Sequence, residues 1–453
     1  EMPAVAPGLV PCAKIYLEKG TVAMERMPEI VAPGMEIKSN YDEDTNDVKE
    51  TVDIFGTTIP GPIAYPKNNA QNLEAAFRIR VGQFTGGDEQ ALKDFTSYAR
   101  ELIKEMPDNY ITPGDDLEHL VRTYGDKKGR RLHKLAEEAL GPRDFIADAM
   151  VKSEAYLGKS DENFKSRMII IKTLKMVGKF SRAIKVMGKN LSKLFDGSGQ
   201  ILYATGCTPD TVGGFAQSMF DQFPTVTESD VSNWDGSLAT IVKELEVFYI
   251  DNKVVGLPEE FDEVLARWHK TRIIAKNGQL QVKKSHGRDS GDLWTATFNT
   301  LLDILVIMWV YRLRWSDDFK ILVLGDDNVV AINKQLEPVD MCNITEKYQS
   351  IGMVCTIVNV NDITDLNFCS GWFINVDGRY RYANSPFRVL AKLGMNHHKH
   401  SPKKYKSLLL GTCKGLLCTS GHVPIVSSIL RAIIRTADET GVRAFYDNRD
   451  LNP

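Results

Sequence analysis

Residues 322–330 read LVLGDDNVV, and this stretch decides the fold. Apolar residues stand on both sides of a Gly-Asp-Asp triplet, which predicts two buried strands joined by a tight turn. Gly325 lets the turn tighten because it has no Cβ atom. The sequence therefore predicts a β-hairpin over residues 319–332, with Asp326 and Asp327 presented at its tip.

The spacing of apolar residues predicts further strands and helices on both sides of this hairpin. Strands are predicted at residues 223–231, 353–360 and 368–376. Helices are predicted at residues 72–105, 115–140, 238–251, 292–313 and 339–351. The central order of strand, helix, helix, hairpin, helix and strand is typical of an α+β fold with helices behind one face of a sheet.

The bulk composition is ordinary for a globular chain. The 453 residues suggest two or three packed subdomains. A composition of 43% hydrophobic and 25% charged residues excludes the disordered and fibrous classes. Seven scattered cysteines without CxxC spacing favour a reducing compartment over a disulfide framework. The longest apolar run, residues 304–310, is too short to span a bilayer.

The net charge of −3 hides an uneven distribution of charge along the chain. Residues 1–110 carry 11 Lys and Arg against 18 Asp and Glu. Residues 151–200 carry 11 against 4, and residues 372–453 carry 13 against 5. Two basic stretches in a nearly neutral chain fit a phosphate-binding channel, although a solvated charged face explains either stretch alone about as well.

Two aspartates on separate strands have the character of a metal site for nucleotidyl transfer. That reaction uses two divalent cations about 4 Å apart, and magnesium prefers a few carboxylate ligands. Asp230 lies near a strand end in SDVSNWDG, residues 229–236, and Asp326 lies in the hairpin turn. Between them, residues 290–299 read SGDLWTATFN, where Thr295 and Asn299 are four apart and share a helix face.

Several similar features have a simpler interpretation. A second Gly-Asp-Asp triplet at residues 114–116 follows a proline and reads as a helix start. The NHHKH run at residues 396–400 reads as an exposed basic loop in preference to a zinc site. Trp294 and Phe298 are expected to face the core, and Cys369 to be packed and unreactive.

The D-x4-D, SG-x3-T-x3-N and GDD series resembles motifs A, B and C of the RNA-dependent RNA polymerases of positive-strand RNA viruses. LNFCSGWF at residues 366–373 resembles their motif E. Lys152-Ser153-Glu154 with KSRMI at residues 165–169 resembles the basic motif F. YGDKK at residues 124–128 resembles the segment that precedes motif F in tombusvirus-like members. The likeness covers about residues 120–375 and is to the tombusvirus-like and nodavirus-like group.

This resemblance implies an α+β right-hand polymerase with an antiparallel-sheet palm, mostly mixed fingers and a small helical thumb. The implied divisions follow the motifs along the chain. They are an N-terminal arm and fingers-associated region at 1–110, fingers at 111–222 with motif F at about 152–172, palm at 223–255, a fingers insertion at 256–289, palm with motifs B to E at 290–375, and thumb at 376–453.

The resemblance also implies a role for each motif residue. Asp230 and Asp326 would be the main ligands of two Mg²⁺ ions, which Mn²⁺ can replace, with Asp327 auxiliary. Asp235 and Asn299 would bond the ribose 2′-hydroxyl. Thr295 would assist Asp235 and Asn299. Ser290 and Gly291 would form a flexible loop that grips the template and the incoming nucleotide. The triphosphate would be contacted by Lys165, Arg167, Lys152 and, with less support, Lys172.

The implied partners are template and product RNA, ribonucleoside triphosphates and other viral replication proteins. The implied location is the host cytoplasm, in membrane-associated replication complexes. One departure from the family pattern concerns the general acid, because residues 352–360 contain no motif D lysine. Lys347, on the preceding helix, is expected to face solvent.

Two other functions share parts of this pattern. A reverse transcriptase would carry an aromatic residue at the sugar-reading position and usually before the paired aspartates, where this chain has Asp235 and Gly325. A non-catalytic RNA-binding scaffold would be expected to lose a metal ligand, and none is lost. A structural alternative for Asp235 is a cap of the helix that begins near Leu238.

Overall fold

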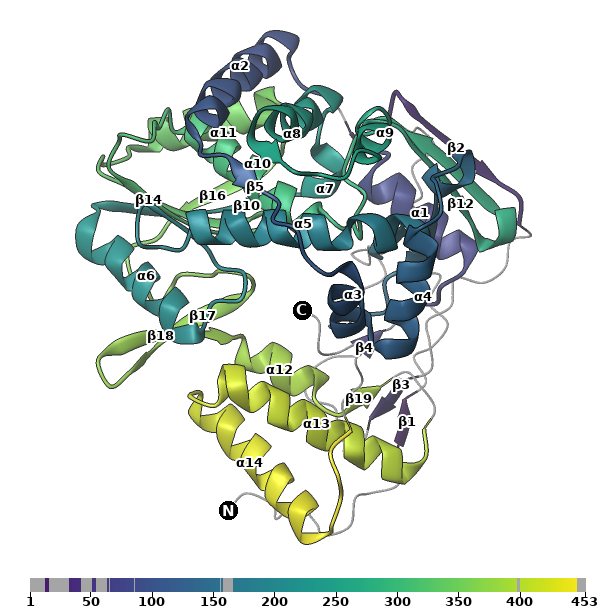
Figure 1. Cartoon of the computed structure of the whole chain (residues 1–453). Helices are drawn as coiled ribbons and strands as arrows, with labels where there is room; N and C mark the ends of the chain where they lie inside the picture. The colour runs from purple at the N-terminus through teal and green to yellow at the C-terminus, as the bar shows by residue number, and fades with distance from the viewer. Residues whose placement is uncertain are drawn as a thin grey trace.

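The computed structural model describes residues 32–41, 66–84, 86–154, 166–396 and 400–445, and the backbone of short strands at 13–15, 51–53, 63–64 and 156–157. Its centre is a five-stranded sheet (Figure 1). The strand order is β16 (Cys355–Asn359), β10 (Thr225–Val231), β15 (Asp327–Ile332), β14 (Phe319–Leu324) and β9 (Ile201–Tyr203). All neighbours are antiparallel except β14 and β9, which are parallel.

Both faces of this sheet are apolar and covered. Along β14, Ile321 and Val323 join one core cluster and Leu322 joins the other, because successive side chains of a strand point to opposite faces. The first face packs on α10 (Thr295–Val310) and the helices around it. The helices of that cluster are α2 (Glu89–Glu105), α5 (Leu174–Leu194), α8 (Thr240–Lys253), α9 (Phe261–Leu265) and α11 (Pro338–Ser350).

The second face packs on α6 (Pro209–Gln222) and on the hairpin of β17 (Gly371–Val376) and β18 (Arg379–Asn384). Helices cover the first face as expected, and α6 covers part of the other face as well, which was not predicted. Both β9 and α6 fall within residues 111–222, which the sequence divisions assigned to the fingers, and yet both belong to the central sheet layer.

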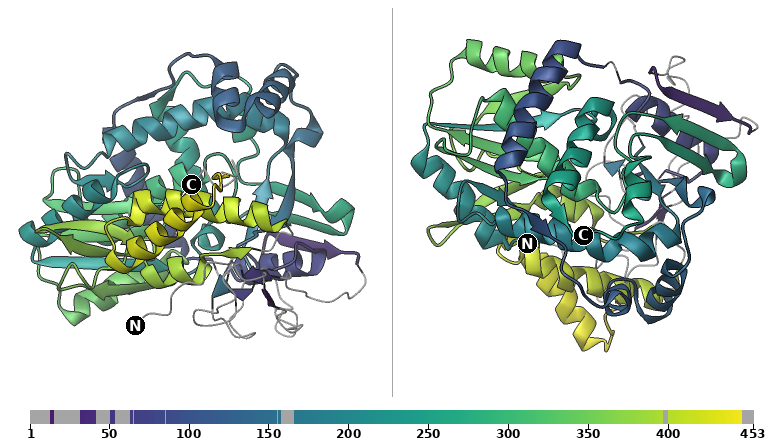
Figure 2. Two further views of the ribbon diagram at one scale, coloured as in Figure 1. Left: turned by 90° about the horizontal axis from the view of Figure 1, so that it is seen from below. Right: turned by 45° about the horizontal axis from the view of Figure 1, so that its top comes forward.

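A second five-stranded sheet lies to one side of the first (Figures 1 and 2). Its order is β2 (Met35–Ser39), β13 (Leu280–Lys284), β12 (Thr271–Ala275), β6 (Ile146–Val151) and β8 (Met168–Ile171). The apolar side of α1 (Ala70–Arg80) packs against it. Three segments far apart in sequence thus form one layer: the N-terminal arm, the basic motif F region and the insertion at 256–289.

Two short helices, α3 (Asp116–Tyr124) and α4 (Asp126–Ala136), pack against α5. The carboxylate of Asp115 caps α3 by accepting a hydrogen bond from the backbone of Glu118 (3.0 Å). The interpretation of the second Gly-Asp-Asp triplet as a helix start is confirmed. The helical region predicted at 115–140 is divided into α3 and α4 at Gly125, whose φ is +82°.

The C-terminal region is a helical layer, seen in yellow in Figures 1 and 2. It comprises α12 (Pro386–Lys392), α13 (Pro402–Ser420) and α14 (Pro424–Glu439), which share an apolar cluster with β18. The remaining elements are α7 (Trp234–Ser237), β1 (Ala13–Ile15), β3 (Thr51–Asp53), β4 (Ile63–Ala64), β5 (Asn109–Tyr110), β7 (Tyr156–Leu157), β11 (Val254–Val255), β19 (Met395–Asn396) and 3-10 turns at Pro142–Phe145 and Lys276–Gly278. Of the histidine-rich run, residues 397–399 lie outside the described residues.

Candidate active site

The predicted hairpin is present and places two aspartates at its tip. Leu324 pairs with Asp327, so Gly325 and Asp326 alone form the turn. Gly325 has a φ of +69°, a conformation that suits glycine. Both Asp326 and Asp327 reach the surface, but surrounding protein removes part of their contact with water. The apolar flanks that define the strands therefore also fix where the two carboxylates emerge.

Strand β10 brings Asp230 to the same end of the sheet. Ser229 pairs with Asn328, so the next residue, Asp230, lies beside Asp327 on the neighbouring strand. Desolvation and the charge of Asp230 raise the pKa of Asp327. The three predicted metal-binding aspartates thus converge from segments almost one hundred residues apart.

The carboxylates form a region of concentrated negative charge. Desolvation by surrounding protein raises the pKa of Asp326 to about 6, and the charges of Asp235 and Asp327 add to the increase. Like-charged carboxylates repel one another, and a divalent cation relieves that repulsion. The acidic oxygen donors therefore fit magnesium. Within the described residues, no three His, Cys, Asp or Glu side chains are already arranged around one metal position.

Helix α10 holds the hairpin through residues that the sequence analysis did not single out. The backbone N–H of Gly325 donates to Thr300 Oγ1 (2.9 Å). Asn328 donates to both oxygens of the buried Asp303 (3.0 and 3.2 Å) and accepts from Ser229 (2.7 Å). Burial raises the pKa of Asp303 well above its ordinary value. The signal in the sequence was an acidic residue directly before the apolar run at 304–310.

The carboxylate of Asp235 bonds to two other motif residues and does not cap α8. Asn299 Nδ2 donates to Asp235 Oδ1 (2.8 Å), and the hydroxyl of Ser290 donates to Asp235 Oδ2. Helix α8 begins after Ala239 without a side-chain cap. Thr295 does not join this group, because its hydroxyl donates to the carbonyl of Asp289 (2.9 Å).

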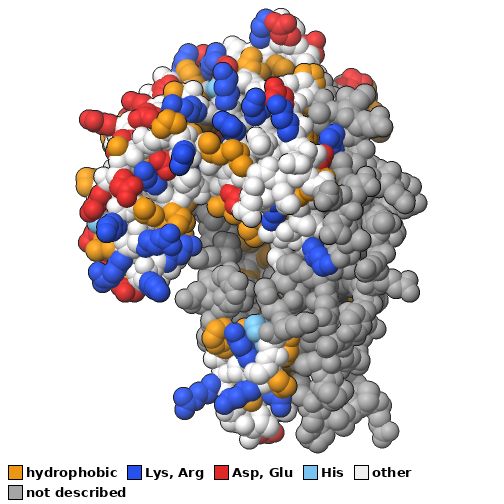
Figure 3. Space-filling view, turned by 90° about the vertical axis from the view of Figure 1, so that its right-hand side faces the viewer, with side chains coloured by type: hydrophobic (Ala, Val, Ile, Leu, Met, Phe, Trp, Pro, Cys, Tyr) orange, Lys and Arg blue, Asp and Glu red, His pale blue; other side chains and the backbone are white. Residues whose placement is uncertain are grey.

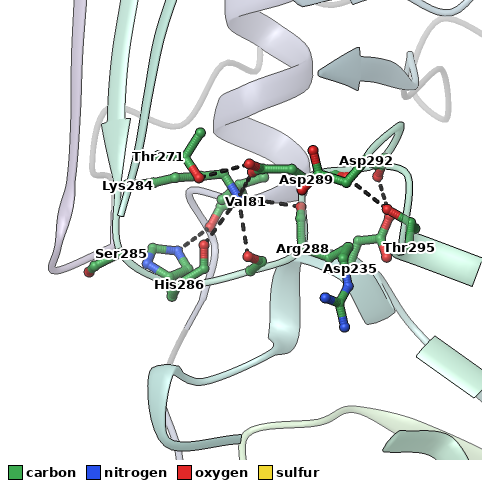
Figure 4. Close-up of polar contacts among 12 residues, drawn as sticks. Val81, Asp235, Thr271, Lys284, Ser285, His286, Arg288, Asp289, Asp292 and Thr295 are labelled. Carbon is green, nitrogen blue, oxygen red and sulfur yellow. Dashed lines mark hydrogen bonds and ion pairs between the residues drawn. The ribbon is translucent and has the colours of Figure 1, made fainter. Parts of the chain in front are cut away.

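The loop before α10 is held by a buried lysine (Figure 4). Lys284 forms an ion pair with Asp289 (2.7 Å) and donates to the carbonyls of His286, Gly287 and Arg288 (3.2, 3.2 and 3.3 Å). Thr271 also donates to Asp289 (2.7 Å). None of these contacts was predicted, because the partners become neighbours only when β12 and β13 fold beside the loop.

Gly291 allows this loop to approach the second sheet. Its φ is +108°, and an added Cβ atom would lie 2.7 Å from the carbonyl oxygen of Ile170. The backbone N–H of Ile170 in turn donates to the carbonyl of Ser290 (2.7 Å). The predicted Ser-Gly pair is thus fixed against β8, next to the basic motif F segment.

Basic side chains approach the aspartates from that segment. The positive charge of Arg167 is close enough to offset part of the upward pKa shift of Asp326 and Asp327. Lys152 is partly exposed to solvent and pairs with Glu154 (3.1 Å). Lys165 lies outside the described residues. Lys172 pairs with Asp289 and Asp292 (2.9 and 3.4 Å), so in this structure its amine is engaged with the loop before α10.

Three further expectations have clear outcomes. Trp294 and Phe298 are buried in the main core, as predicted. Cys369 is packed, and burial together with Asp327 raises the pKa of its thiol, which makes the thiolate scarce. The expectation that Lys347 faces solvent is wrong, because it is half-buried and its amine donates to the carbonyl of Val310 (2.7 Å).

The surface is hollowed between the main body and the C-terminal helices, with Lys and Arg side chains on both sides of the hollow (Figure 3). Helix α4 is strongly basic, with the sequence DKKGRRLHKLA. On α12, burial and the charges of Arg388, Lys152 and Arg167 lower the pKa of Lys392. The helix α12 therefore lies near the motif F segment, although the two are more than two hundred residues apart.

Comparisons with known proteins agree with this geometry. Residues 160–409 match the family described as RNA dependent RNA polymerase. The chain is 22% identical to the "RNA-directed RNA polymerase" of Tomato bushy stunt virus (strain Cherry) over 284 residues, 60% of this chain and 33% of the relative. It is 26% identical to the "RNA-directed RNA polymerase 2a" of Olive latent virus 2 (isolate Italy) over 194 residues, 41% of this chain and 22% of the relative.

A third relative is the "Genome polyprotein" of Human rhinovirus C (strain C15), 29% identical over 165 residues, 35% of this chain and 7% of the relative. The matched regions span a third or less of these three relatives. The family match covers more than half of the chain and includes every predicted motif residue from Asp230 to Asn299 and the aspartates of the hairpin. The chain therefore belongs to the RNA-dependent RNA polymerase family of positive-strand RNA viruses.

Proposed function

We propose that this chain transfers ribonucleotides to a growing RNA strand under the direction of an RNA template, with two divalent cations bound by Asp230 and Asp326. The observation that carries the proposal is the convergence of Asp230, Asp326 and Asp327 at one end of adjacent strands. Their mutual repulsion supports cation binding at that position.

The metal-binding residues have distinct roles in this proposal. Asp230 and Asp326 are the main ligands, and Asp327 is auxiliary. Two Mg²⁺ ions, which Mn²⁺ can replace, would activate the attacking 3′-hydroxyl and neutralise the leaving pyrophosphate. Arg167, whose charge reaches the hairpin aspartates, orients the triphosphate, because a guanidinium can donate two hydrogen bonds to phosphate oxygens. Lys152 and Lys165 contribute positive charge to the same segment.

Sugar selection depends on Asp235 and Asn299. Each oxygen of the Asp235 carboxylate takes one donor in this structure, one from Asn299 and one from Ser290, and each keeps a free lone pair. A ribose 2′-hydroxyl can donate to such an oxygen, whereas a deoxyribose leaves it without that donor. The bond between Ser290 and Asp235 also links the template loop, with Gly291, to the sugar-reading residues.

The arrangement of layers supports a right-hand architecture. The palm is the central sheet with α8, α10 and α11, and it includes β9 and α6 in addition to residues 223–255 and 290–375. The fingers are the second sheet with α1, α3 and α4, which unites parts of 1–110, 111–222 and the 256–289 insertion. The thumb is the helical region from 376 onward. The hollow and its basic rims fit template and product RNA.

The biological setting follows from the family. We propose that the chain acts in the host cytoplasm within membrane-associated replication complexes, together with other viral replication proteins. Among the helices in the described part of the chain, none is long and apolar enough to cross a bilayer.

Primer extension tests the proposed reaction. Purified protein is incubated with Mg²⁺, a homopolymeric RNA template, a complementary primer and each of the four ribonucleotides in turn. Only the complementary ribonucleotide should be incorporated, and a chelator should stop the reaction. Incorporation that ignores the template, or synthesis only on a DNA template, would overturn the assignment.

A further inference from the structure

A line of buried hydrogen bonds runs behind the sugar-reading residues and connects several separate elements. Glu246 on α8 accepts from Trp268 Nε1 (2.7 Å) and from both terminal nitrogens of Arg288 (2.8 Å for Nη1). Arg288 Nε then donates to Asn299 Oδ1 (2.9 Å), and Asn299 Nδ2 donates to Asp235 (2.8 Å). Glu246, Arg288 and Asn299 are 0%, 2% and 5% exposed, so water scarcely competes for these bonds.

The chemistry of the neighbours fixes which way the Asn299 amide points. A guanidinium can only donate, so the atom facing Arg288 must be the amide oxygen. An ionised carboxylate can only accept, so the atom facing Asp235 must be the amide nitrogen. Asp235 and Arg288 therefore favour the same orientation of the amide, one from each side. Arg288 fixes the oxygen end of Asn299, which the carboxylate of Asp235 does not contact.

The guanidinium is suited to this position in a way that a lysine is not. Its two terminal nitrogens are both used by Glu246, and this planar, two-point attachment aims the remaining Nε at Asn299. A lysine amine could stay near Glu246 and preserve the buried charge pair. It could not hold the same pair of bonds and reach Asn299 in a fixed direction.

We infer that Arg288, anchored by Glu246, is a positioning residue that aligns Asn299 and Asp235 and thereby sets the preference for ribonucleotides over deoxynucleotides. The inference rests on the proposed sugar-reading role of Asp235 and Asn299. Arg288 also lies two residues before Ser290, which donates to the same Asp235 carboxylate.

The first test is Arg288→Lys, which keeps a positive charge against Glu246 and so avoids an unpaired buried carboxylate. The catalytic efficiency kcat/KM is measured for GTP and dGTP on the same primed template. The ratio of the two efficiencies should fall roughly 3- to 10-fold, because ribonucleotide use loses a well-aligned hydrogen bond that deoxynucleotide use does not make. A purely structural effect would lower both efficiencies together and leave the ratio unchanged, and that result would overturn the inference.

A double-mutant cycle shows whether Arg288 acts through Asn299. Asn299→Ala alone should lower the ratio of kcat/KM for GTP to kcat/KM for dGTP. Adding Arg288→Lys to Asn299→Ala should lower this ratio no further. If the two effects multiply, Arg288 acts independently and the inference is wrong. If Asn299→Ala leaves the ratio unchanged, the proposed sugar reading itself fails, and the positioning role fails with it.

Two further variants keep the test decisive. Glu246→Gln retains the shape of the anchor and removes its charge, so it should also lower the GTP-to-dGTP ratio of kcat/KM. This variant tests the inference even if Arg288→Lys fails to fold. Arg312→Lys is the matched control, because Arg312 also pairs with a carboxylate, Asp94 (3.0 Å), at the other end of α10. If Arg312→Lys lowers the GTP-to-dGTP ratio as much as Arg288→Lys does, the effect is a general one of arginine replacement and the inference is refuted.

Discussion

At the residue scale, the surroundings of Asp235 separate two roles for one carboxylate. A helix cap would accept from backbone N–H groups, whereas this carboxylate accepts from the side chains of Asn299 and Ser290. Those two donors come from α10 and from the loop before it. This carboxylate therefore does not act as a helix cap, and its two side-chain donors support the proposed sugar recognition.

Asp235→Ala should lower ribonucleotide incorporation while deoxynucleotide incorporation changes little. The variant removes an acceptor that only the 2′-hydroxyl would use. Hydrogen bonds of this kind contribute about 1–3 kcal/mol when buried, which corresponds to roughly 5- to 100-fold in relative efficiency. Parallel kinetics with GTP and dGTP measure the effect. Equal losses for both nucleotides would instead indicate a structural role for Asp235.

Lys243 provides a pH test at the same scale. It is 5% exposed, and desolvation together with the charge of Lys284 lowers its pKa to about 8. The unfolded chain binds this proton up to about pH 10.5, so the folded state should gain stability as pH rises from about 8 to 10.5. Lys243→Met should remove that gain and raise the free energy of unfolding at pH 7 by on the order of 1–3 kcal/mol.

Urea unfolding at pH 7 and pH 10 measures this effect in the wild type and the variant. The prediction requires that the difference between the two proteins shrink at the higher pH. A variant that is less stable than the wild type at pH 7 would show that the charged amine has favourable contacts in the folded protein.

At the element scale, helix α10 and the hairpin of β14 and β15 act as one unit. Thr300 accepts from the turn at Gly325, and its own hydroxyl hydrogen goes to the carbonyl of Ala296 (2.9 Å). Asp303, one helical turn later, accepts hydrogen bonds from the side-chain amide of Asn328. The helix thus contacts the hairpin at its turn and at its returning strand, and it sets where the aspartates stand.

Thr300→Val should weaken synthesis without changing the choice of nucleotide. The substitution keeps the volume of the side chain but leaves the N–H of Gly325 without its acceptor, at a cost of about 1–3 kcal/mol. We expect a loss in kcat of roughly 3- to 30-fold from misplaced carboxylates. Thr300→Ser retains the hydroxyl and is the matched control. Equal activity of the valine and serine variants would contradict this coupling.

The elements with strong periodic signals could be predicted from the sequence. The hairpin and α10 combine long apolar runs with a glycine turn or a Ser-Gly start, and both were correct to within a few residues. The covering of the second face by α6 could not be foreseen. Strand β9 has only three residues, and its partner β14 lies more than one hundred residues later, so nothing local reveals the pairing.

The residues of the candidate site also fall into those that could be predicted from the sequence and those that could not. Motif residues such as Asp230 and Asn299 were found because their spacing is characteristic of a family. Arg288 and Glu246 were missed, because they are 42 residues apart and their pairing depends on how α8 packs against the loop before α10. A buried ion pair of this kind is decided by tertiary structure and leaves no periodic trace in the sequence.

At the scale of the whole molecule, charge is arranged around the site and not spread evenly. The net charge of the chain is −3, yet basic groups from the motif F segment and from α12 lie together near the acidic end of the central sheet. Phosphate contacts from such groups support RNA binding independently of the metal ligands. Binding and chemistry should therefore be separable by mutation.

Asp326→Asn tests that separation and the central claim of a carboxylate-held metal site. Asparagine keeps the shape of the side chain and removes its charge, so the cation loses a charged ligand while the phosphate contacts remain. Asp115→Asn is the matched control, because Asp115 belongs to the other Gly-Asp-Asp triplet and asparagine caps a helix equally well. All three proteins are compared for RNA affinity and for RNA synthesis in Mg²⁺.

The most direct measurement is the rate of RNA synthesis by Asp326→Asn relative to the wild type, at equal occupancy of template. We predict a fall of roughly 100-fold or more, with RNA affinity nearly unchanged and with full activity in Asp115→Asn. If the Asp326→Asn variant retains more than about a tenth of the wild-type rate in Mg²⁺, the assignment of Asp326 as a metal ligand is contradicted.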